Sequence, residues 1–324
     1  KNFKVTRDIS LQVYSNYSSF SEKIYIFLMI VRRFIYSFIK LITVKDFVYV
    51  MKEYIFDESI FWKNREKLID KVITTQTQLL VQPLIFRFDI TKEKRIMIWY
   101  SANSLPMKYK DQSQLVLGFP DNFYNNIKVD EHWVWNKSNA VYIRKLTSKK
   151  AVIKGPMLFY GPSLKQNTSP RVDVLLFDVT PPNSMPENSI VSEKYVSSFI
   201  SEIVQVVEEL KDFQQLKIGL KSKRETGNFH SKIYLEMLEQ YFNSGRITKI
   251  NHMENIYDLI INAKIVFAFP LTSPIFIAKE LGVDCAFYSS SNLLENQTSY
   301  YGIKFINNQF ALRKFLVRNV LRIP

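Results

Sequence analysis

The sequence predicts an α/β protein with two domains of alternating strands and helices. From about residue 80 onward, short apolar segments alternate with amphipathic helical segments, which is typical of parallel sheets. A polar stretch at 161–170 interrupts this alternation and is interpreted as a linker. The predicted parts are a helical N-terminal region, two Rossmann-like domains that face a cleft, and a basic C-terminal helix, at residues 1–75, 76–165, 171–303 and 304–324.

Each predicted element rests on a local pattern. Strands are predicted where runs of Val, Ile, Leu, Phe or Trp end in polar turns, and helices where apolar residues recur with helical spacing. In the first domain these are strands 95–100, 132–135 and 151–154, with a helix ending near residue 146. In the second domain the strands are 172–177, 217–220, 247–250, 265–269 and 285–288, and the helices between them are 192–210, 231–243, 256–262 and 274–282.

Composition narrows the class of protein. Apolar residues make up 47% and charged residues 23% of the 324 residues, which is typical of a globular chain. A single cysteine excludes an internal disulfide and a cysteine-rich zinc site. The three histidines lie far apart, without metal-ligand spacing. Neither GxGxxG nor GxxxxGK[ST] occurs, which disfavours dinucleotide dehydrogenases and P-loop enzymes.

The net charge of +14 fits nucleic acid, an anionic membrane surface or an anionic substrate. Residues 304–324 contain five Lys or Arg and no acidic residue, and as a helix they suit a membrane surface or pack on a neighbouring domain. The apolar runs 24–31 and 34–42 are too short to span a bilayer. They are interpreted as amphipathic helices that bury one face in the protein or lie in a bilayer interface.

Asp178 follows the first strand of the second domain and is a candidate catalytic residue. The carboxyl ends of parallel strands meet at the edge where ligands bind in open α/β sheets. A carboxylate there can act as nucleophile or general base. The alternative is a residue that caps the following turn through its own backbone.

The next strand leads into a basic loop. Lys221, Lys223 and Arg224 are candidate donor-binding residues because cations there suit phosphate and carboxylate groups. Glu225 can orient Arg224 or act as a base. The alternative is a solvated loop. His252, after the third strand, is a further candidate for contact with the donor, or it faces solvent.

The segment 265–282 predicts a strand, a hydroxyl-bearing turn and a helix. Thr272 or Ser273 can cap the helix, Pro274 fits its first position, and Gly282 fits its end. A helix N-terminus favours anions, so Thr272 and Ser273 are candidates for binding a donor phosphate. The alternative is a capped αβ unit without a ligand.

Polar residues after strands of the first domain suit a sugar acceptor. The alternative for each residue is ordinary turn chemistry, and the residues are Ser101, Asn103, Ser104 and Asn136. No Asp-x-Asp motif is present, so no metal ion or other cofactor is expected, and cations would balance the donor phosphate. These features together fit a metal-independent, GT-B-like glycosyltransferase.

The chain resembles the PFTS-motif polysaccharide-biosynthesis proteins over about residues 95–290. Leu271 stands where the motif has Phe, an apolar exchange. The residues that carry the resemblance are 269–274, 278–282 and 287–288, with support from 99–104, 133–136, 155–156 and 177–181.

This family looks similar in layout to bacterial GT-B transferases that use CMP-activated ulosonic acids such as Kdo. The resemblance implies a transferase of surface-polysaccharide or lipopolysaccharide synthesis, with Asp178 attacking the anomeric carbon in a retaining reaction. It also implies a glycan or lipid-linked acceptor. The basic ends favour a peripheral position at the inner face of the inner membrane, and the absence of a helix-turn-helix, RRM or KH pattern disfavours a nucleic-acid partner. The alternatives are an inverting transferase with another nucleotide-sugar donor, an inactive scaffold, and a non-catalytic basic protein that binds membrane or nucleic acid.

Overall fold

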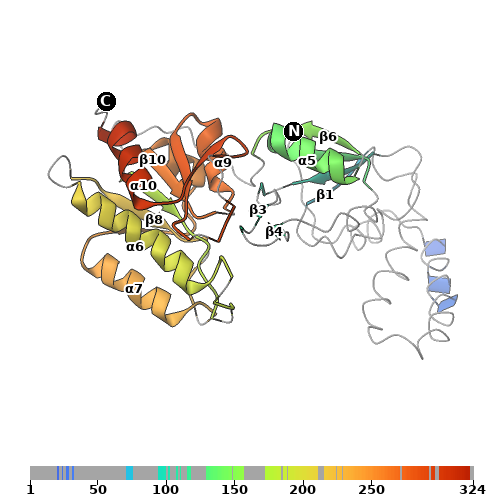
Figure 1. Ribbon diagram of the computed structural model, residues 1–324. Coiled ribbons are helices and arrows are strands. Elements are labelled where there is room, and N and C mark those ends of the chain that lie inside the picture. Colours follow the sequence, from blue (N-terminus) through green and yellow to red (C-terminus); the bar gives the residue numbers. More distant parts are fainter. Residues whose placement is uncertain are drawn as a thin grey trace. The chain divides into compact units, whose positions relative to one another are not determined.

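The computed structural model describes two compact units (Figure 1). The described residues are 71–75, 94–102, 129–156 and 172–321, with short gaps, and parts of 20–32 and 107–117. One unit comprises Lys1–Ile98, Asp121–Trp133 and Leu146–Val152, and the other comprises Trp99–Pro120, Val134–Lys145 and Ile153–Pro324. The segments that follow two strands of the small sheet therefore belong to the larger unit.

The smaller unit is built on a four-stranded sheet. Its strands are β1 (Lys71–Thr75), β2 (Lys94–Ile98), β5 (Glu131–Val134) and β6 (Lys150–Ile153), in the order β1-β2-β5-β6. The pairs β1–β2 and β2–β5 are parallel. Helix α5 (Lys137–Thr147) connects β5 to β6, and β3 (Met107–Lys108) pairs antiparallel with β4 (Leu115–Leu117).

Residues 1–75 were predicted to be mostly helical, and the structure places a strand, β1, at their end. Its sequence, Lys-Val-Ile-Thr-Thr, holds four consecutive β-branched residues, which favour an extended backbone. The described residues between Phe20 and Arg32 are helical. No helix in the described part of the chain is long and apolar enough to cross a membrane.

The larger unit is built on a seven-stranded sheet. Its order is β12-β13-β11-β10-β7-β8-β9, and every neighbouring pair is parallel except β12–β13. Counted along the chain from β7 and leaving out β12, this is the order 3-2-1-4-5-6 of doubly wound nucleotide-binding sheets. The strands are β7 (Val172–Phe177), β8 (Ile218–Lys221), β9 (Thr248–Ile250), β10 (Ala263–Ala268), β11 (Asp284–Tyr288), β12 (Ser299–Tyr300) and β13 (Ile303–Ile306).

Helices cover both faces of this sheet. Right-handed crossovers that run in opposite directions from the centre place α6 and α7 on one face and α9 on the other. Accordingly, α6 contacts α7 and α10, whereas α8 contacts α9. The helices are α6 (Glu193–Glu209), α7 (Lys232–Asn243), α8 (Ile256–Ile261), α9 (Pro274–Glu280) and α10 (Gln309–Leu316), which continues as a π-helix, η6 (Val317–Leu321).

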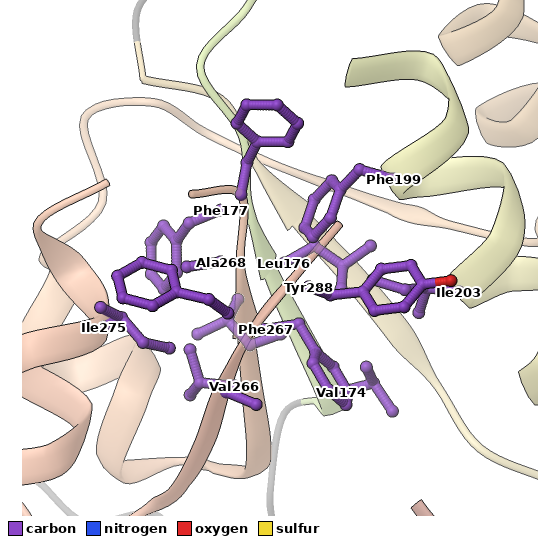
Figure 2. Close-up of a cluster of buried hydrophobic side chains, with 14 of the residues drawn as sticks. Val174, Leu176, Phe177, Phe199, Ile203, Val266, Phe267, Ala268, Ile275 and Tyr288 are labelled. Atoms are coloured by element: carbon purple, nitrogen blue, oxygen red, sulfur yellow. The ribbon is translucent and has the colours of Figure 1, made fainter. Parts of the chain in front are cut away.

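The core lies around the two central strands, β7 and β10. All six residues of β7 are buried, as expected for a parallel strand covered on both faces. Figure 2 shows Phe267, Phe199 and Tyr288 converging on this region from β10, α6 and β11. The rings of Phe199 and Phe269 meet edge to face, with centroids 5.6 Å apart. This packed centre fixes the positions of the loops that follow the strands.

The C-terminal part corrects a predicted boundary. Residues 303–306 form β13, which pairs with β11, and the basic helix begins only at Gln309. The strand is short, and its partner lies far away in sequence, so its pairing has no local signal. Helix α10 buries Leu312, Phe315 and Leu316 and contacts α6. The helix is therefore packed on the domain, which is one of the two arrangements that its sequence allows.

Candidate functional site

The candidate site lies at the carboxyl edge of the seven-stranded sheet. β7 and β10 are hydrogen-bonded neighbours at the point where the strand order reverses. Phe177 pairs with Ala268, and the N–H of Phe269 donates to the carbonyl of Phe177 over 2.9 Å. Asp178 and the turn before α9 therefore leave the sheet side by side. In open α/β sheets, such a reversal is where ligands bind.

Asp178 is buried, with 2% of its surface exposed. Its carboxylate accepts a hydrogen bond from the hydroxyl of Tyr234 on α7 and longer ones, of 3.3 and 3.4 Å, from the hydroxyl of Thr180. The backbone N–H groups of Lys223 and Thr180 also donate to it. Thr180 has a φ of 44°, a left-handed conformation that turns the chain back toward the carboxylate.

Burial raises the pKa of Asp178 because it disfavours the charged form, and these hydrogen bonds oppose the rise. Burial, together with the nearby Asp178 carboxylate, also raises the pKa of Tyr234 well above its usual value. Tyr234 thus remains a hydrogen-bond donor at neutral pH. In this arrangement the Asp178 oxygens face protein donors, so attack on a substrate would require them to be released first.

Lys221 ends β8 beside Phe177 of β7. Its side chain is buried, and its Nζ donates to the carbonyl of His252 over 2.6 Å. Burial lowers the pKa of Lys221, and the carboxylates of Glu254 and Asp178 oppose this shift. The ammonium therefore links the loops after β8 and β9 and places a cation beside the buried carboxylate.

The other predicted donor-binding residues are distributed over these loops. Lys223 and Glu225 are exposed, and the side chain of His252 is half-buried. Arg224 lies outside the described residues. The basic loop therefore presents exposed charge at the carboxyl edge, next to the buried residues Lys221 and Asp178.

The turn before α9 uses its hydroxyl groups differently from the predicted helix caps. Thr272 donates to the carbonyl of Phe269 over 2.8 Å. Ser273 is the N-cap residue by position, but its side chain caps no helical N–H. Its Oγ instead lies 2.8 Å from Oγ of Ser101 and accepts from the N–H of Ala102 over 3.1 Å. The predicted capping is thus wrong, whereas Pro274 at the helix start is confirmed.

Of the four predicted acceptor-binding residues, the structure describes two. Ser101 joins Ser273, as above. Asn136 accepts from the N–H of Asn139 over 2.9 Å, which is the ordinary capping interaction at the start of α5. Asn103 and Ser104 lie outside the described residues.

Tyr234 and Thr180 were missed by sequence reasoning. A tyrosine near the start of an amphipathic helix has the pattern of a core residue, and nothing local connects it to Asp178, which lies 56 residues earlier. Thr180 had a weak signal, because a hydroxyl residue two positions after an Asp favours a local turn.

Within the described part of the chain, no group of three His, Cys, Asp or Glu side chains is placed to hold a metal ion.

The sequence matches a protein family. Residues 37–316 match the model of the polysaccharide biosynthesis PFTS motif proteins. The chain therefore belongs to this family. No curated protein matches the sequence.

Solved structures with a similar fold are distant in sequence. TarM of S. aureus, in a complex with UDP, has a TM-score of 0.47 and 9% identity over 82% of this chain and 52% of that one. The Gap123 complex of Streptococcus agalactiae has a TM-score of 0.47 and 10% identity over 83% and 52%. The wall teichoic acid polymerase TagF has a TM-score of 0.45 and 10% identity over 78% and 64%. The chain spans about half the length of the first two.

Proposed function

We propose that this protein is a GT-B-like glycosyltransferase of bacterial surface-polysaccharide or lipopolysaccharide synthesis. It transfers a sugar from a nucleotide-activated donor to a glycan or lipid-linked acceptor. Membership of a polysaccharide-biosynthesis family supports the pathway. One structural observation supports a ligand at the sheet edge: Lys221, Asp178 and the start of α9 follow three adjacent parallel strands at the point where the strand order reverses.

The proposed donor is a CMP-activated ulosonic acid such as Kdo, as the family resemblance implies. Such a donor carries one phosphate and one sugar carboxylate, so the site must supply positive charge. Lys223 is exposed on the loop after β8, and Lys221 lies buried behind it. Thr272 and Ser273 complete the proposed donor site, together with Arg224 and His252. No metal ion takes part in the proposed reaction.

The chemistry follows one of two courses. In a retaining reaction, an Asp178 oxygen bonds to the anomeric carbon as CMP leaves with the bonding electrons. The acceptor oxygen then displaces the Asp178 carboxylate as the proton of the acceptor hydroxyl passes to Glu225. Tyr234 donates to Oδ2, so the attacking oxygen is Oδ1, which must first be released from the Thr180 hydroxyl by a local rearrangement on donor binding. In an inverting reaction, Glu225 or Asp178 takes the proton of the acceptor hydroxyl as it attacks.

A peripheral position at an anionic membrane is part of the proposal. Five apolar side chains share helical spacing on the described part of residues 20–32, and each exposes 38 to 80% of its surface: Phe20, Ile24, Phe27, Leu28 and Val31. Residues 23–45 contain Lys or Arg at five positions and no acidic residue. An apolar face with basic neighbours suits the interface of an anionic bilayer. Sedimentation with anionic, but not zwitterionic, vesicles tests this part.

The first experiment is a thermal-shift measurement with CMP, CDP, UMP, UDP and GDP, with and without Mg²⁺. A ligand that binds only the folded state raises the melting temperature. Stabilisation by CMP without Mg²⁺ supports the proposed donor and leads to transfer assays with CMP-Kdo. Selective stabilisation by UDP or GDP supports transferase activity but contradicts the proposed CMP-activated donor. No response to any nucleotide contradicts the proposed activity.

A further inference from the structure

Tyr234 occupies a special position at the start of α7. It is fully buried, and its hydroxyl donates to the Asp178 carboxylate. Its backbone N–H donates to the hydroxyl oxygen of Ser231, the N-cap residue of the helix. The hydroxyl of Ser231 in turn donates to Glu193 in the first turn of α6. Hydrogen bonds therefore hold Tyr234 at its hydroxyl, which bonds the residue after β7, and at its backbone, which bonds the N-cap of α7.

The same carboxylate connects further loops. The backbone N–H of Lys223 donates to Asp178, so the basic loop after β8 is tied to β7. Lys221 lies beside Asp178 and is hydrogen-bonded to the loop after β9. One buried carboxylate is thus connected, directly or through the neighbouring Lys221, to the loops that follow three neighbouring strands. Its orientation affects where the exposed cations of the basic loop lie.

We infer that Tyr234 is a positioning residue of the candidate site: its hydroxyl holds the Asp178 carboxylate in one orientation. A neutral, buried carboxyl group would lose much of its hold on the Lys223 N–H and would be a poor nucleophile or base. The inference deepens the proposed function, and the expected effect of Tyr234 on the transfer rate rests on that function. The expected effect of Tyr234 on the stability of the fold is independent of it.

The physical reason is the balance between burial and hydrogen bonding at Asp178. Burial favours the protonated form, and the Tyr234 hydroxyl is foremost among the groups that oppose it. Among the described residues, charged groups near the carboxylate include Lys221 on β8, Lys223 on the loop after it, Glu254 after β9, which acts on Lys221, and Glu193, which contacts Ser231. Removing the tyrosine hydroxyl therefore raises the pKa of Asp178 further.

The test compares Tyr234→Phe with Tyr257→Phe. Tyr257 is a matched control because it is also buried and also donates one hydrogen bond, to the carbonyl of Pro156 over 3.2 Å. When folding raises the pKa of a carboxyl group, the free energy of unfolding of the protein falls as pH rises from the unfolded pKa to the folded pKa of that group. The destabilisation by Tyr234→Phe is therefore expected to grow between mildly acidic and neutral pH, whereas that by Tyr257→Phe stays constant.

A double-mutant cycle with Asp178→Asn gives a second readout by urea unfolding. Asparagine keeps the shape of the side chain and removes its charge. The two substitutions are expected to be non-additive, because Tyr234→Phe removes the hydrogen bond and Asp178→Asn removes the charge that strengthens it. Additive effects, or a pH-independent loss in Tyr234→Phe like that of the control, would overturn the inference.

The kinetic arm separates this inference from the proposed activity. In a transferase assay, Tyr234→Phe is expected to lower kcat by up to about a hundredfold, as misplaced catalytic groups do, with KM nearly unchanged. A normal kcat would overturn the positioning function in catalysis. If the wild-type protein transfers no sugar, the proposed function fails, while the pH dependence and the cycle still decide whether Tyr234 positions Asp178.

Discussion

The hydroxyl groups of Ser101 and Ser273 lie 2.8 Å apart, although 172 residues separate them in sequence. Ser273 also accepts from the N–H of Ala102 over 3.1 Å. The segment after β2 is thereby joined to the start of α9, at the carboxyl edge of the large sheet. Both serines were predicted to bind ligands, one on the acceptor side and one on the donor side. The structure shows that they bind each other.

We expect Ser273→Ala to lower the free energy of unfolding by about 1–2 kcal/mol, because it leaves the Ser101 hydroxyl and the Ala102 N–H without this partner. Ser101→Ala should cost less, since Ser273 keeps its bond to Ala102. Urea unfolding measures both effects, and the double variant should show coupling. Ser198→Ala is the control, because its hydroxyl bonds only within α6 at the surface. Equal effects of all three single variants would contradict the prediction.

Asp178→Ala is expected to abolish sugar transfer without unfolding the protein, because the reaction loses its proposed nucleophile or base. Initial rates with the nucleotide-sugar identified by thermal shift measure this effect. Asp173→Asn is the matched control: Asp173 lies on the same strand at the opposite edge of the sheet, where it pairs with Lys264 over 2.8 Å. Transfer by Asp178→Ala at a near-normal rate would remove Asp178 from the mechanism.

Lys221→Met is expected to weaken the binding of nucleotide phosphates by about tenfold, because it removes a positive charge worth on the order of 1.4 kcal/mol to a nearby anion. The methionine keeps most of the aliphatic stem, so the packing of β8 is largely preserved. Isothermal titration with the stabilising nucleotide measures the change. Lys264→Met removes a lysine at the far edge of the sheet and should leave affinity unchanged. Unchanged affinity in Lys221→Met would exclude Lys221 from the donor site.

His132 on β5 is expected to make the protein sensitive to acid. Its side chain is 1% exposed, and burial, with a smaller contribution from Lys149, lowers its pKa from 6.5 to about 4. A histidine with a depressed folded pKa stabilises the fold above its unfolded pKa, and this stability is lost as pH falls through the folded value. Between about pH 6.5 and 4 the loss should reach roughly 3 kcal/mol.

Urea unfolding across this pH range measures the loss. The variant His132→Gln cannot take up a proton there, so its stability should depend less on pH than that of the wild-type protein. Parallel pH profiles for the two proteins would show that His132 does not carry the effect.

Local sequence predicted much of the larger unit. The apolar segment 172–177 was predicted as a strand with the same bounds as β7, and the helices predicted at 192–210 and 231–243 begin at the N-cap residues of α6 and α7. Gly282 ends α9 with a φ of 72°, a conformation that favours glycine. Strand β1 was missed although its β-branched run favours a strand, because residues 1–75 were interpreted as mostly helical. Strand β13 was missed because residues 304–324 were interpreted as one basic helix, and its pairing depends on β11.

The sequence by itself determined which residues follow each strand, and so which side chains belong to the carboxyl edge. That is a local property, set by apolar runs and the turn residues that end them. Only the tertiary structure decided the partners of those side chains: Asp178 with Tyr234, Lys221 with the carbonyl of His252, and Ser273 with Ser101. These contacts depend on the order of strands in the sheet and on helix packing, which bring distant segments together. No local sequence pattern predicts them.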